Sequence, residues 1–120
     1  MSTKPPQCYA TDPQAECLRV EMSPDRSLVL PLDQFVFAEL SSAANEQVLR
    51  LSFGSHEVTV RGSVLRRIES AMQDLELCFL TVLSAKFNPL VPDGQPRIRE
   101  IVVTENKPPT PEMVLQDARK

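Results

Sequence analysis

The amino-acid sequence predicts a small α+β protein. One amphipathic helix packs on a mostly antiparallel sheet of about five strands, in the order β-β-β-α-β-β. No proline lies between Leu32 and Asn88, so this block can hold uninterrupted regular structure. Apolar residues alternate along 47–53 and 56–61, as in strands, and then recur at helical spacing along 64–75. A strongly bent sheet that closes into a small Sm-like barrel is the alternative architecture.

The length and composition are those of one globular domain. The chain has 120 residues, of which 42% are hydrophobic and 24% charged, and it has no tryptophan, so its core is expected to be aliphatic. Prolines are frequent near both ends. We therefore expect an N-terminal arm at 1–27, a single α+β domain at 28–105 and a C-terminal tail at 106–120.

The first strand of the domain is expected over 34–41, and a short edge strand is expected in the arm over 17–22. Strict alternation along 34–41 sends Phe35 and Phe37 to one face and the apolar residues between and after them to the other. Such a strand is apolar on both faces. It must therefore be covered on both sides.

The next two strands form a hairpin around Gly54-Ser55, a dipeptide typical of a two-residue type II′ turn. This loop length places Leu51 opposite Val58 and Leu49 opposite Val60. One face of the hairpin is then apolar and the other polar.

The helix is expected to follow Ser63, which is a good N-cap residue. Its apolar stripe is formed by Leu65, Ile68, Met72 and Leu75, and we expect this stripe to pack on the apolar face of the hairpin. An apolar run at 76–83 and an alternating segment at 97–105 predict the last two strands, with a proline-rich loop between them.

The sequence offers little material for catalysis or metal binding. His56 is the only histidine, whereas a zinc site needs about three or four ligands, and no C-x-x-C or H-x-x-H spacing is present. Ser55 and His56 are neighbours, which strand alternation would send to opposite faces. Cys78 lies in an apolar run, as a buried residue does. We therefore expect no metal, no cofactor and no enzymatic activity.

Four arginines form the one locally basic segment and are the candidates for binding an anion or an acidic protein partner: Arg50, Arg61, Arg66 and Arg67. They also support an alternative function, a nucleic-acid-binding small barrel. The net charge of −3 and the scarcity of aromatic residues for base stacking argue against nucleic acid.

The doubly apolar strands suggest self-association, because one short helix cannot cover both. The candidate contact residues are Phe35, Phe37, Leu80 and Val82. We therefore expect a non-catalytic binding or assembly module that forms a homodimer. A small enzyme is the remaining alternative.

The cysteines and the hydropathy pattern indicate a compartment. Cys8, Cys17 and Cys78 are odd in number and irregularly spaced, which does not suit a disulfide framework. No run of apolar residues has the length of a membrane span or the position of a signal peptide. We therefore expect a cytoplasmic protein with no membrane partner.

Overall fold

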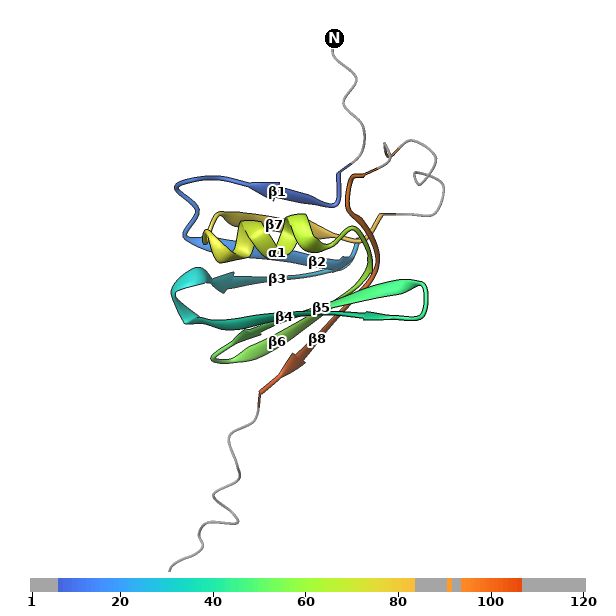
Figure 1. Ribbon diagram of the computed structural model, residues 1–120. Coiled ribbons are helices and arrows are strands. Elements are labelled where there is room, and N and C mark those ends of the chain that lie inside the picture. The colour runs from blue at the N-terminus through green and yellow to red at the C-terminus, as the bar shows by residue number, and fades with distance from the viewer. Residues whose placement is uncertain (1–6, 84–90, 92–93, 107–120) are drawn as a thin grey trace, which may run out of the picture.

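Two four-stranded sheets share one apolar core in the computed structural model of the protein, which describes residues 7–83, 91 and 94–106. One sheet has the strand order β1-β7-β2-β3 and the other β4-β5-β6-β8, and Figure 1 shows them as two layers. The elements, in chain order, are β1 (Tyr9–Thr11), β2 (Cys17–Ser23), β3 (Arg26–Pro31), a 3-10 turn (Leu32–Gln34), β4 (Phe35–Ala43), β5 (Glu46–Phe53), β6 (His56–Ser63), α1 (Arg66–Gln73), β7 (Leu77–Thr81) and β8 (Arg97–Glu105).

The α+β class, the mostly antiparallel pairing and the single helix are as the sequence predicts. The strands are more numerous than expected and lie in two sheets, and in the described part of the chain these sheets do not close into a barrel. Only β2 and β7 pair in parallel.

The second sheet exists because part of the predicted N-terminal arm is folded into it. Strand β2 was expected at an edge, but it lies between β7 and β3, and its Leu18 and Val20 are fully buried. Alternation of apolar and charged residues along β2 turns these two side chains toward β4-β5-β6-β8. The arm therefore covers apolar residues of the other sheet, a role for which the sequence predicted a second copy of the protein.

The β5-β6 hairpin has the predicted register, with Leu51 opposite Val58 and Leu49 opposite Val60. All four of these side chains are fully buried. The two-residue loop is present, but Gly54 does not have the positive φ of a type II′ turn. Instead, the loop is held by its neighbours: the Gly54 N–H donates to the carbonyl of Gln34 at 2.9 Å.

Strand β4 departs from strict alternation at a bulge. Phe35 pairs with Phe53 and Phe37 pairs with Ser52, so Val36 is the extra residue on β4, and its side chain is 63% exposed. Phe35 therefore packs inward, edge-to-face against Phe53 with ring centroids 5.7 Å apart. Phe37 lies on the outer face. The prediction that Phe35 and Phe37 point the same way is wrong.

Helix α1 packs against β4 of one sheet and β7 of the other, along one side of the core (Figure 1). Leu65, Ile68 and Met72 are fully buried, as the stripe predicts. Ser63 is not the N-cap, because it still belongs to β6. Leu65 takes that position, and its N–H donates to the side-chain oxygen of Gln47 at 2.7 Å.

The fourth residue of the predicted stripe, Leu75, lies beyond the helix and is 46% exposed. Its N–H donates to the carbonyl of Met72, and the N–H of Glu76 donates to the carbonyl of Ala71, both at 2.9 Å. These two bonds form a Schellman motif, in which Leu75 takes the left-handed position with φ of +56°. The prediction that Leu75 is buried is wrong because the chain reverses before reaching it.

Gly62 allows β6 and β8 to approach each other. A Cβ atom at this position would lie 1.9 Å from the carbonyl oxygen of Arg97, at the point where the pairing of the two strands becomes irregular. The backbone of β8 occupies the space that any side chain would need.

We expect Gly62→Ala to lower the free energy of unfolding by about 1–3 kcal/mol, because backbone atoms must move to admit the methyl group. Gly54→Ala is the matched control. Its Cβ would come no closer than 3.8 Å to another atom, so a change within about 0.5 kcal/mol is expected. Urea unfolding of the two variants measures both effects. Equal losses would contradict the account of Gly62.

Candidate functional site

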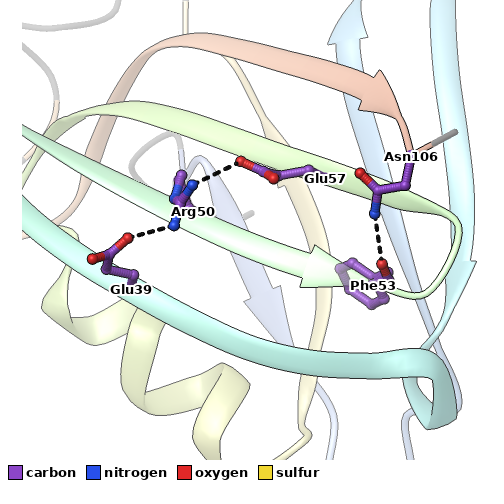
Figure 2. Close-up of polar contacts among 5 residues, drawn as sticks. All are labelled: Glu39, Arg50, Phe53, Glu57 and Asn106. Carbon is purple, nitrogen blue, oxygen red and sulfur yellow. Dashed lines mark hydrogen bonds and ion pairs between the residues drawn. The ribbon is translucent and has the colours of Figure 1, made fainter. Parts of the chain in front are cut away.

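Arg50 lies at the centre of the outer face of β4-β5-β6-β8, between two carboxylates (Figure 2). Its Nη2 donates to Glu39 Oε1 at 2.6 Å and its Nη1 donates to Glu57 Oε2 at 3.4 Å. The guanidinium also lies 5.8 Å from the ring centroid of Phe37. The strand register produces this arrangement, since Glu39 on β4 is directly opposite Arg50 on β5. The positive charge of Arg50 is therefore already paired within the chain.

Arg61 is paired on the same face. Its Nε lies 3.6 Å from Glu100 Oε1, on the neighbouring strand β8. Beside this pair, Arg99 donates two hydrogen bonds to Glu46, at 2.6 and 3.1 Å, and these bonds hold the pKa of the Glu46 carboxyl below its usual value. Two of the four predicted arginines thus belong to a sheet face of alternating charges.

Arg66 and Arg67 are separate from that face and lie on the first turn of α1. Both side chains are exposed, and neither makes an ion pair with any residue that the structure describes. Together with Tyr9, Val64 and Ser70 they line a shallow concavity of about 560 Å³. The structure therefore does not bring the four arginines together, and among the described residues this pair has no ion-pair partner.

At the opposite end of α1, two carboxylates also make no ion pair with a described residue. Asp74 caps the helix C-terminus and Glu76 follows two residues later. Neither forms an ion pair within residues 7–83, 91 and 94–106. A helix macrodipole disfavours cations at its N-terminus and anions at its C-terminus, by about 0.3–1 kcal/mol each. Arg66 and Arg67 at one end and Asp74 at the other are therefore placed against the dipole of α1, whereas Glu69 in the first turn is placed with it.

We call the exposed side of this helix the α1 ridge and treat it as the candidate functional site; its residues are Arg66, Arg67, Ser70, Asp74 and Leu75. Of these residues, only the two arginines were predicted from the sequence as candidate site residues. Leu75 was expected in the buried stripe and Asp74 was not singled out, because helical spacing does not show where the helix ends. The available signal was Asp74 itself, a residue that favours helix ends over helix interiors.

His56 lines a second concavity, of about 540 Å³, at the end of the molecule where β3, β6 and β8 meet. Asp25, Arg26 and Glu105 are among the other lining residues. The Nδ1 of His56 is 2.8 Å from Ser55 Oγ, so the prediction that these neighbours point apart is wrong. Ser55 belongs to the loop, where strand alternation does not apply. Among the described residues, no three His, Cys, Asp or Glu side chains are grouped closely enough to share a metal ion.

The four residues predicted for self-association do not form one exposed patch. Leu80 is fully buried, because β7 lies between β1 and β2 and turns this side chain into the core. Its assignment to a contact with a second copy is therefore wrong. Phe35 and Val82 are partly buried against the core, and only Phe37 is well exposed, at 45%.

The three cysteines are free thiols in different surroundings. Cys8 is fully buried, and its Sγ lies 3.4 Å from the carbonyl oxygen of Pro96, to which it donates. Burial raises the pKa of the Cys8 thiol from its ordinary value of 9.0 to about 11. Cys17 is exposed, and Cys78 is half-buried at the irregularity between β1 and β7, so it is less buried than its apolar run predicts.

Comparison of the chain with protein-family models, with curated proteins and with solved structures finds no match. In the described part of the chain, no helix has the length and apolar character needed to cross a membrane. A proposal of function therefore rests on the α1 ridge and its charges.

The buried thiol predicts a pH dependence of stability. Because the pKa of Cys8 is higher in the folded state than in the unfolded state, its contribution to stability is complete below about pH 9 and is lost as pH rises toward about 11. We expect Cys8→Ala to flatten the fall in unfolding free energy across this range, while the exposed-site control Cys17→Ala keeps it. Urea unfolding at a series of pH values measures the slope. A Cys8→Ala protein with the wild-type slope would contradict the assignment.

Proposed function

We propose that the protein is a non-catalytic binding or assembly module that associates with a second copy of itself. The observation that carries this proposal is that one exposed ridge holds charges of both signs that make no ion pair with any described residue, with Arg66 and Arg67 at one end and Asp74 at the other. A surface that holds both signs in separate positions is complementary to itself when it is rotated by half a turn. A two-fold dimer is the simplest assembly that uses this property.

The same charges favour a second copy over an acidic protein or a nucleic acid. A uniformly negative partner would meet Asp74 and Glu76 as well as the arginines, and like charges that face each other oppose binding. Arg50 and Arg61, which the nucleic-acid alternative requires, are paired with carboxylates of the neighbouring strands. The free thiols support a reducing compartment, such as the cytoplasm, as the place where the module works.

Light scattering over a range of protein concentration tests the proposal. Between about 1 μM and about 1 mM we expect the mass to rise from the 13.4 kDa of one chain toward twice that value, since weak association appears in this range. Raising the salt from about 0.1 M to about 1 M shortens the Debye length from about 10 Å to about 3 Å and should reduce the association. A constant mass of one chain at every concentration would overturn the proposal.

A further inference from the structure

We infer that two copies pair through α1, with the helices antiparallel about a two-fold axis close to Ser70, and that Leu75 of each copy enters the concavity beside Val64 of the other. This inference rests on the proposed self-association and names its interface. Three features of the α1 ridge support it: the spacing of its charges, the direction of the helix dipole and the conformation of Leu75.

The charges have the spacing that a two-fold axis requires. Arg67, Ser70 and Asp74 are separated by three and four residues, which places them on one face of the helix. Arg67 and Asp74 are about 10 Å apart along the helix axis, with the small Ser70 near their midpoint. A two-fold axis there sets Arg67 of each copy against Asp74 of the other, and the serine lets the two helices approach closely.

Antiparallel pairing also offsets the unfavourable interaction of these charges with the dipole of their own helix. Each chain holds two arginines in the first turn of α1 and carboxylates at its C-terminus. These charges oppose the dipole of their own helix, whereas Glu69 in the first turn does not. In the antiparallel pair, the C-terminus of one helix lies beside the N-terminus of the other. Arg66 and Arg67 then face the negative end of the partner helix, and Asp74 faces the positive end.

Leu75 provides an apolar contact at each end of the pair. A leucine at φ of +56° is unusual, since the left-handed position of a Schellman motif favours glycine, and here the side chain is 46% exposed. An unfavourable backbone conformation that presents an apolar side chain to the surface suggests a role for that side chain. Along the chain, Arg66 and Leu75 are equally far from the two-fold axis near Ser70 and lie on opposite sides of it.

The two-fold axis therefore brings Leu75 next to the concavity that Arg66 shares with Tyr9 and Val64. Val64 also has a φ of +56°, so two left-handed residues flank the helix. Both would lie at the edge of the same interface. Leu75 of one copy would be inserted, and Val64 of the other copy would line the concavity that receives it.

Two charge-reversed proteins test the pairing. The first is Arg66→Glu with Arg67→Glu, and the second is Asp74→Lys with Glu76→Lys. Each protein alone would place like charges opposite each other, and we expect its association to weaken by roughly tenfold or more. An equimolar mixture of the two should recover the mass of the dimer, because opposite charges then face each other. Asp25→Lys with Glu105→Lys matches the charge change of the second protein away from the ridge and should associate as the wild type does.

The outcomes distinguish the interface from the proposed function. A wild-type protein that stays monomeric would overturn both. A wild-type dimer whose charge-reversed variants associate as strongly as before would leave the proposed function standing and overturn the α1 interface. Loss of association in each variant with no recovery on mixing would overturn the antiparallel pairing.

Substitution of Leu75 tests the apolar contact separately. Leu75→Gly should raise the urea midpoint of the dilute monomer, because glycine suits the left-handed backbone, and should weaken association by roughly tenfold. Leu75→Ala keeps the unfavourable backbone and removes most of the side chain, so it should weaken association without the gain in stability. Dimers of unchanged affinity in both variants would overturn the role of Leu75.

Discussion

The apolar contact between the two sheets is the interaction on which the rest of the structure depends. Leu18 and Val20 of β2 belong to the same buried cluster as Leu51 and Val58 of the β5-β6 hairpin, and α1 adds Ile68 to it. In the described part of the chain, no polar or charged residue is buried. Apart from the Cys8 thiol, which donates to the carbonyl of Pro96, the described side chains of the core therefore supply burial without directional bonds. The alignment of the strands depends on side-chain alternation and on the bulges that interrupt it.

Every ionised side chain of the described residues lies outside this core, at the surface. The sheet and the helix differ in whether such a side chain has an ion-pair partner nearby. On β4-β5-β6-β8 the register sets opposite charges on neighbouring strands, so Arg50 and Arg61 find partners within the chain. On α1 the two arginines of the first turn lie too far from Asp74 to pair with it, and no ion pair joins them to Glu69 of the same turn. Folding thus pairs the charges of the sheet face, whereas Arg66, Arg67 and Asp74 of the α1 ridge make no ion pair with any residue that the structure describes.

Local pattern predicted the features that depend on neighbouring residues and missed those that depend on distant ones. The register of the β5-β6 hairpin follows from alternation and loop length alone. The central place of β2 depends on parallel pairing with β7, far along the chain, which no local pattern reveals. One bulge residue, Val36, was enough to turn Phe37 outward. At the site, the arginines were visible in the sequence, but the pairing of Arg50 needed the register of β4, and the exposure of Leu75 needed the end of the helix.

Native-state hydrogen exchange tests most directly whether the two sheets form one core. If they do, the most protected amides of β2 and β7 should open with the same free energy as those of β5 and β6, and this value should equal the global free energy of unfolding measured with denaturant. The shared cluster of buried side chains requires this result, because neither sheet can expose its inner face without exposing the other. Amides of β2 and β7 that exchange through a much lower opening free energy would show that β1-β7-β2-β3 separates on its own, and would contradict the single core.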